Sequence, residues 1–84
     1  MELQEFIDSA VPLKGEEVFK VTQDLAFYGR DDVEGEMYGN CMFLEFDNEV
    51  GDWALNLGGE VRYDTKENLQ TIAYEVMTGE RHGF

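Results

Sequence analysis

The sequence has little of what covalent cross-linking or metal binding requires. Its 84 residues include one cysteine, one proline and one histidine. A single cysteine excludes an internal disulfide, and so few cysteines and histidines exclude a structural zinc site. No apolar run approaches the roughly 20 residues of a membrane-spanning helix, and Met1–Glu5 lacks the positive charge that begins a signal peptide. We therefore expect a cytoplasmic protein without a cofactor.

Positive charge is also scarce. Six Lys and Arg stand against 19 Asp and Glu, which gives a net charge of −13. Such a chain repels nucleic acids and anionic membranes, which are themselves negatively charged, and attracts basic surfaces. The alternative is that the acidity serves only solubility or adaptation to salt. With 43% hydrophobic and 13% aromatic residues, the chain can still build a core, and residues 1–84 are expected to form a single domain.

The hydrophobic periodicity predicts an α+β fold, a small antiparallel meander with helices at both ends of the chain. Leu3, Phe6, Ile7 and Ala10 lie on one face of a helix expected over residues 2–10. Pro12 is expected to end that helix. Residues 16–28 fit either a strand or a helix, and the β-branched and aromatic residues of Val18–Thr22 favour a strand in the first half.

The meander is expected over residues 36–64. One strand runs from Met37 to Phe46, with apolar residues on both faces, and the next runs from Asp52 to Leu57. The pair Gly58–Gly59 predicts a two-residue hairpin, because glycine accepts the positive φ that such turns require. After the hairpin, Val61 and Tyr63 are expected to continue the buried face formed by Trp53, Leu55 and Leu57.

The last expected helix covers residues 66–78 and packs on the sheet. Asp64 and Glu67 have the spacing of a capping box with Asp64 as the cap, and Gly79 is a natural C-terminal cap. The helix has one apolar stripe, formed by Leu69, Ile72, Ala73, Val76 and Met77.

Residues that could perform catalysis are few and scattered. The sequence has one serine, Ser9, with Cys41 and His82 as the other candidates, and each falls in a different expected element. No local motif of a catalytic triad or phosphate-binding loop accompanies them. Segment 47–52 matches an EF-hand loop poorly, and segment 31–36, which could hold a cation weakly, is better explained as a solvated acidic loop. We therefore expect no enzyme activity, no cofactor and no metal site.

The negative charge is concentrated in one part of the sequence. Between Asp31 and Val61 there are nine acidic residues and no basic ones. The expected meander puts segments 31–36 and 47–52 at opposite ends of one strand, about 30 Å apart at about 3.3 Å per residue. That separation resembles one turn of duplex DNA. The residues expected to bind a partner are Asp31, Asp32, Glu34, Glu36, Glu45, Asp47, Glu49 and Asp52.

In size, charge and order of elements, the chain resembles small inhibitors encoded by phages or other mobile elements. The order of elements in question is a strand, Glu60–Tyr63, that leads into the capped helix from Asp64 to Thr78. Such inhibitors include anti-CRISPR and anti-restriction proteins that act as DNA mimics. The resemblance implies inhibition of a basic nuclease or defence effector, with no direct nucleic-acid or membrane binding. It carries over no individual functional residue.

Two further hypotheses remain open at this stage. The chain could be an immunity protein or antitoxin that neutralises a basic toxin. It could instead be a structural or adaptor protein of a phage, with Tyr28, Tyr38, Trp53 and Phe84 forming an apolar contact.

Overall fold

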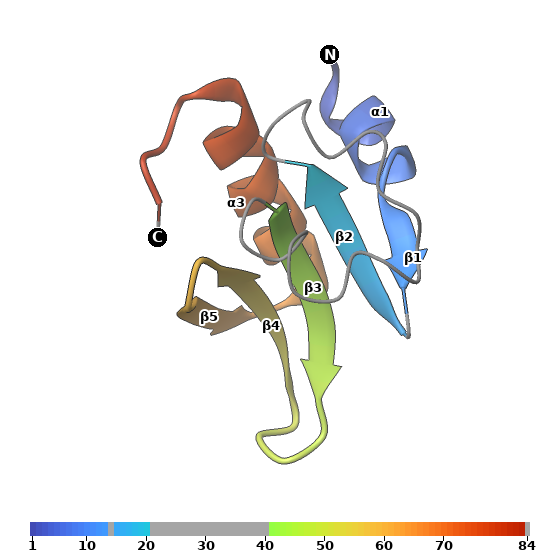
Figure 1. Cartoon of the computed structure of the whole chain (residues 1–84), viewed down its shortest axis with the longest axis vertical. Coiled ribbons are helices and arrows are strands. Elements are labelled where there is room, and N and C mark those ends of the chain that lie inside the picture. The colour runs from blue at the N-terminus through green and yellow to red at the C-terminus, as the bar shows by residue number, and fades with distance from the viewer. Residues whose placement is uncertain (14, 21–40, 84) are drawn as a thin grey trace.

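Five antiparallel strands form one sheet in the computed structural model, which describes residues 1–13, 15–20 and 41–83 (Figure 1). The strands lie side by side in sequence order, from β1 to β5. This arrangement confirms the expected α+β fold, with a meander and a helix at each end of the chain. In chain order the elements are α1 (Leu3–Asp8), β1 (Val11–Leu13), β2 (Glu16–Lys20), β3 (Cys41–Asp47), β4 (Asp52–Leu57), β5 (Glu60–Asp64) and α3 (Lys66–Thr78).

Both helices pack on the same face of the sheet, and the main core lies between the two layers. The ring of Phe6 from α1 stacks on Phe19 of β2 at 4.7 Å between centroids, and Tyr74 of α3 meets Phe6 edge-on at 5.6 Å. Burying each large apolar side chain contributes about 1.5–3 kcal/mol. Neither described helix has the length and apolarity needed to cross a membrane. The core residues are Phe6, Phe19, Met42, Leu44, Leu55, Leu69, Ile72 and Ala73.

The N-terminal segment follows the expected helix but then adds a strand that the sequence did not predict. In α1, Phe6 is buried, and Ile7 and Ala10 pack against the core, as the apolar stripe indicates. Helix α1 ends before Pro12, as expected, but Pro12 itself lies within β1 at the edge of the sheet. An edge strand tolerates proline, since one side of the strand needs no N–H donor.

The described part of the ambiguous segment 16–28 is a strand. Residues 16–20 form β2, which confirms the interpretation favoured for the first half, and residues 21–28 lie outside the described residues. Residues 41–46 of the expected strand 37–46 belong to β3, and residues 37–40 lie outside the described residues. Cys41 and Met42, the first two residues of β3, point to opposite faces and both are fully buried. The start of β3 is therefore covered on both faces, as predicted.

The hairpin between β4 and β5 confirms the expected glycine turn but corrects the face assigned to the second strand. Gly58 and Gly59 have φ of 54° and 90°, as a two-residue turn with two left-handed residues requires. The turn pairs Leu57 with Glu60, so Leu55 lies opposite Arg62. Directly opposed residues share a face of the sheet. The core face of β4, formed by Trp53, Leu55 and Leu57, therefore continues into Glu60, Arg62 and Asp64.

The prediction that Val61 and Tyr63 are buried with that face is consequently wrong. They lie opposite Asn56 and Ala54, on the face of the sheet away from the helices, and they are 47% and 42% exposed. Within each strand, side chains alternate between the two faces as predicted. Across the two-residue turn, however, Glu60 and not Val61 lies on the face of Leu57.

Helix α3 covers the expected residues but is capped one residue later than predicted. The Oγ1 atom of Thr65 accepts a hydrogen bond from the backbone N–H of Asn68 at 3.2 Å, which makes Thr65 the N-terminal cap. Asp64 accepts hydrogen bonds from the Asn68 side chain and the Thr65 N–H at 2.9 and 2.7 Å, and these lower the pKa of its carboxyl group. Asp64 therefore supports the cap from the end of β5.

The buried face of α3 is rotated slightly from the predicted stripe. Leu69, Ile72 and Ala73 are buried and Val76 packs against the core, as expected, but Met77 is 38% exposed. Tyr74 packs against the core in its place, because α1 lies on that side of α3 and supplies Phe6 as a partner. Gly79 ends the helix in the left-handed conformation, with φ of 85°, as predicted.

Candidate functional site

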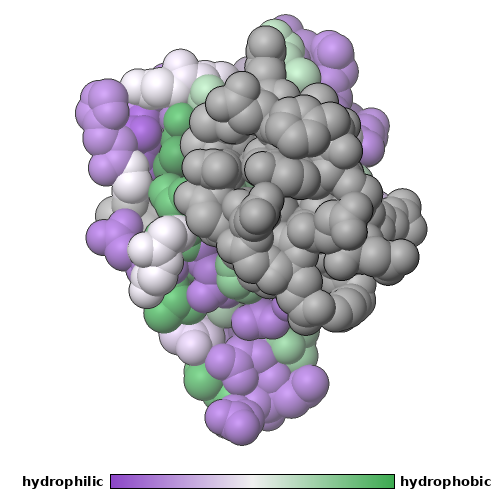
Figure 2. All heavy atoms as spheres, in the orientation of Figure 1, coloured by the Kyte–Doolittle hydropathy of each residue, from purple (hydrophilic) through white to green (hydrophobic). Residues whose placement is uncertain are grey.

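The four described residues of the predicted binding surface lie together on the hairpin formed by β3 and β4. Glu45 and Asp47 belong to β3, Glu49 lies in the turn, and Asp52 begins β4. The turn projects at the end of the molecule opposite the N-terminus (Figure 1). Mainly hydrophilic atoms cover this end in the space-filling view (Figure 2). The other four predicted residues, Asp31, Asp32, Glu34 and Glu36, lie outside the described residues.

Asp47 organises the turn through both oxygens of its carboxylate. Oδ1 accepts hydrogen bonds from the backbone N–H groups of Glu49 at 2.9 Å and Val50 at 3.2 Å. Oδ2 accepts a hydrogen bond from the hydroxyl of Tyr63 at 3.0 Å. These bonds, with that of Tyr63 the largest contribution, hold the pKa of Asp47 below its usual range. Asp47 is therefore a fixed negative charge, joined to β5 across β4.

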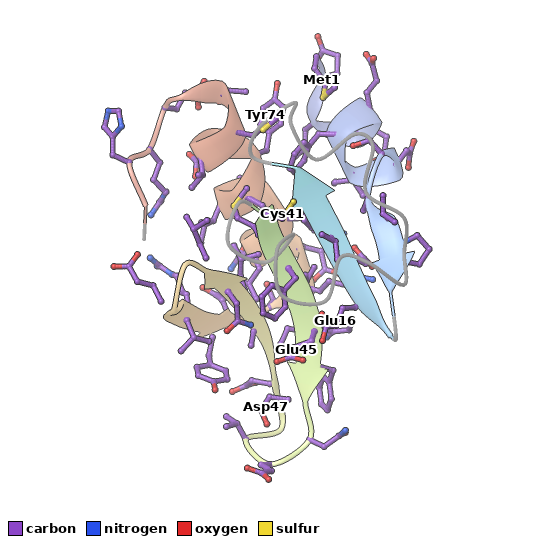
Figure 3. The ribbon with its side chains drawn as sticks, viewed as in Figure 1. Met1, Glu16, Cys41, Glu45, Asp47 and Tyr74 are labelled. Atoms are coloured by element: carbon purple, nitrogen blue, oxygen red, sulfur yellow. The ribbon has the colours of Figure 1, made fainter. Side chains whose placement is uncertain are left out.

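Glu45 lies beside the carboxyl group of Glu16, a residue that the sequence analysis did not assign to the site. Glu16 at the start of β2 points toward Glu45 on β3 (Figure 3), so that a hydrogen bond between the two side chains favours the protonated form of Glu45. The pKa of Glu45 is raised, first by partial burial, then by the negative charge and hydrogen bond of Glu16, and last by Asp47. The antiparallel register of β2 and β3 produces this contact between residues far apart in the sequence.

A second pair of like charges lies at the end of the hairpin. Asp47 and Asp52 are direct cross-strand partners in the pairing of β3 with β4. Like charges at opposed positions of a sheet are destabilising. We call the five acidic residues of this region the acidic end: Glu16, Glu45, Asp47, Glu49 and Asp52.

Three described cations are directed at carboxylates elsewhere in the molecule. Lys66 forms an ion pair with Glu17 at 2.6 Å and lies 4.9 Å from the centre of the Trp53 ring. Arg81 pairs with Glu75 at 3.5 Å. Arg62 contributes to the lowered pKa of Asp64. These positions keep the described positive charge near the helix-covered face.

Exposed apolar side chains accompany the carboxylates of the hairpin. Phe46 is 45% exposed and meets the Trp53 ring edge-on at 5.6 Å between centroids, while Val50 is exposed in the turn. Adjacent residues of a strand point to opposite faces, so Phe46 lies on the face away from Glu45 and Asp47, whereas Val50 shares the turn with Glu49. Sequence reasoning assigned no binding role to Phe46, which it placed at the end of the expected strand 37–46.

The residues with catalytic potential occupy separate, structurally explained places. Ser9 Oγ donates a hydrogen bond to the Phe6 carbonyl at the end of α1, the Cys41 thiol is buried in β3, and His82 is exposed after α3. Within the described ranges, no three His, Cys, Asp or Glu side chains converge in a way that could hold a metal ion. Trp53 is half-buried beneath Lys66, whereas Tyr28, Tyr38 and Phe84 lie outside the described residues.

Comparisons with protein-family models, with curated proteins and with solved structures found no match for this chain. The chemistry of the acidic end is therefore the basis for a functional proposal.

Proposed function

We propose that this chain is a non-enzymatic acidic protein that inhibits a basic partner by occupying that partner's nucleic-acid-binding surface. The partner is then a nuclease or another defence effector, as a protein or a ribonucleoprotein, and the two meet in the cytoplasm of the host cell. Such a function belongs with the phage-encoded inhibitors of anti-CRISPR and anti-restriction type, including DNA mimics. The net charge of −13 and the acidic end support this proposal.

The contact between like charges is the observation that carries the proposal. Glu45 lies against Glu16, which raises the pKa of Glu45, whereas the cross-strand neighbour Asp47 is kept ionised by its hydrogen bonds to Tyr63 and the turn. Solubility depends on net charge, which carboxylates supply equally well when they are far apart. Carboxylates in contact lower stability and add nothing to solubility. A requirement for dense local charge explains an arrangement that solubility alone does not need.

Dense negative charge suits a partner that normally binds DNA or RNA. Duplex DNA carries a phosphate charge about every 1.7 Å of its axis, and its binding proteins present Lys and Arg at matching density. Attraction between such surfaces accelerates association and makes it sensitive to salt. In the turn, Val50 adds exposed apolar contact area that a phosphate backbone lacks, which would slow dissociation of the inhibitor.

The test compares two double charge reversals with the same change in net charge. Glu49→Lys with Asp52→Lys alters exposed positions of the acidic end, while Glu5→Lys with Glu80→Lys alters exposed positions at α1 and after α3. Each immobilised protein is exposed at low salt to a lysate of the cells that naturally contain it. Captured proteins are identified by mass spectrometry, and excess duplex DNA or RNA is then used as competitor.

We expect the native chain and the Glu5/Glu80 variant to capture the same basic protein, and nucleic acid to displace it. The Glu49/Asp52 variant should lose about tenfold or more in affinity, as expected for close charge pairs at an interface. Equal losses in both variants would mean that only net charge matters and would contradict a role for the acidic end. A captured partner that nucleic acid does not displace would overturn inhibition at a nucleic-acid site and favour a toxin or a structural protein as the partner.

A further inference from the structure

Strand β5 forms one edge of the sheet and directs backbone groups outward at two positions. Among the described residues, β5 pairs only with β4. The two-residue turn makes Leu57 and Glu60 a hydrogen-bonded pair, and such pairs recur at every second position of an antiparallel ladder. Arg62 and Asp64 therefore bond to β4. The N–H and C=O groups of Val61 and Tyr63 point away from β4, toward the open side of the edge.

The side chains at these two positions are the exposed apolar residues of β5. Val61 and Tyr63 lie on the face away from the helices, where about half of each side chain is accessible. The opposite edge differs, because β1 has only three residues and one of them is Pro12. Short length and proline are two common ways of protecting an edge strand from pairing. β5 carries neither form of protection.

Carboxylates of the β3–β4 hairpin lie near the Tyr63 end of the apolar strip on β5. The Tyr63 hydroxyl donates its hydrogen bond to Asp47 at 3.0 Å, and the negative charges of Asp47, Glu45 and Glu49 all act on that hydroxyl. The outward backbone groups of β5 thus lie next to two apolar side chains and three carboxylates. An extended peptide that pairs with β5 would contact the backbone groups, the apolar side chains and the carboxylates, as in recognition by β-strand addition.

We propose that β5 binds the partner by pairing edge to edge with an extended basic segment, a strand that combines apolar side chains with Lys or Arg. This inference rests on the proposed function and specifies how the basic partner is recognised. The partner strand bonds to the outward groups of Val61 and Tyr63. Its apolar side chains pack on Val61, and its cations reach Asp47 and Glu45.

Charge complementarity favours a basic partner over a second copy of this chain. Antiparallel pairing of β5 with its own copy over all five residues puts Arg62 opposite Arg62, and Glu60 opposite Asp64. Like charges directly opposed in a sheet are destabilising, and each copy carries a net charge of −13. A basic strand removes both penalties.

The test uses a defined probe, the octapeptide Lys-Thr-Val-Thr-Lys-Thr-Val-Thr, whose Lys and Val side chains share one face of an extended strand, with the full-length protein at low salt. NMR hydrogen exchange is measured for the amides of Val61 and Tyr63 with and without peptide. Affinity is measured for Val61→Pro, which removes an outward N–H but no bond to β4, and for Val61→Thr, which keeps the N–H. We expect the peptide to protect both amides, and Val61→Pro to lose about tenfold in affinity while Val61→Thr stays within about threefold.

Unchanged exchange at Val61 and Tyr63 in the native protein with saturating peptide would overturn pairing at β5, whatever the variants do. Wild-type affinity in a folded Val61→Pro protein would do the same. In either case the Glu49/Asp52 reversal still tests the proposed function separately, because it changes charge on the hairpin and leaves the residues and backbone groups of β5 in place. Protection of both amides without peptide, together with a dimer in sedimentation, would identify a second copy as the occupant and contradict the proposal.

Discussion

The two halves of the β3–β4 hairpin differ in almost every physical property, although they belong to the same two strands. The half near α3 contributes Met42, Leu44 and Leu55, which are fully buried under the helices. The other half carries Asp47, Glu49 and Asp52, and its turn projects away from the helices (Figure 1). Within one hairpin, the first half holds the fold together and the second half presents charge.

The difference separates the free energy of folding from the surface available for binding. Burial of apolar side chains dominates stability, so the core half tolerates few substitutions. The acidic half makes local contacts, such as the hydrogen bonds from Glu49 and Val50 to Asp47. Substitutions of Glu49 and Asp52 should alter charge with little effect on the fold, whereas Asp47 also holds the turn and bonds to Tyr63 of β5. Each prediction below compares a change near the core with a change that the fold should tolerate.

The largest expected difference is between two apolar truncations in this hairpin. Leu55→Ala removes a fully buried side chain beneath α3 and should lower the free energy of unfolding by about 2–5 kcal/mol. Val50→Ala, in the exposed turn, should change it by less than about 0.5 kcal/mol. Urea denaturation followed by circular dichroism measures both. Similar losses for the two variants would contradict the separation of the hairpin into a core half and a surface half.

An intermediate effect is expected where β5 leads into α3. Thr65→Ala removes the side-chain acceptor for the Asn68 N–H and should cost about 1 kcal/mol. Thr71→Ala is the matched control, because Thr71 is exposed inside the helix and its Oγ1 bonds only to the Glu67 carbonyl. Alanine has the higher helix propensity there, so this control should not lose stability. Equal losses in thermal denaturation would argue against Thr65 as the cap.

Most of the fold could be predicted because its elements have strong local patterns. The stripe of Phe6 and Ile7, the Gly58–Gly59 turn and the Leu69–Ile72 face each follow from spacing alone. β1 was missed because three residues around Pro12 carry no periodic signal. The faces of Val61 and Tyr63 were misassigned because only the pairing of Leu57 with Glu60 fixes them.

The candidate site was less predictable, since contacts between strands determine its geometry. Sequence clustering found Glu45, Asp47, Glu49 and Asp52, which are neighbours along the chain. It did not find Glu16, because only the register of β2 against β3 places that residue beside Glu45. Nor did it predict that Asp47 bonds to Tyr63 of β5, an interaction that gives Asp47 a structural role beside its charge.

The smallest expected effect concerns Glu45, and its sign depends on pH. Partial burial and the neighbouring Glu16 raise the pKa of Glu45 above its usual value of 4.5. The folded state therefore binds this proton more tightly than the unfolded state does. The contact is tolerated when Glu45 is protonated, below its usual pKa, and it becomes unfavourable as pH rises through the raised value. Ionised Glu45 thus lowers the stability of the fold at neutral pH.

Replacing the Glu45 carboxyl group with an amide tests whether the dense negative charge of the acidic end lowers the free energy of unfolding. Glu45→Gln should raise the melting temperature slightly at pH 7, by the equivalent of less than about 1 kcal/mol, because solvent still screens a partly exposed pair. The gain should shrink as pH falls toward 4.5, where the native carboxyl takes up its proton. Glu80→Gln, an exposed position after α3, is the control and should show no comparable pH-dependent gain. Calorimetry of the three proteins between pH 4 and 7 measures the difference. A Glu45→Gln protein that is no more stable than the native chain at pH 7 would mean that the Glu16–Glu45 contact is not repulsive, and the main support for the proposed function would be lost.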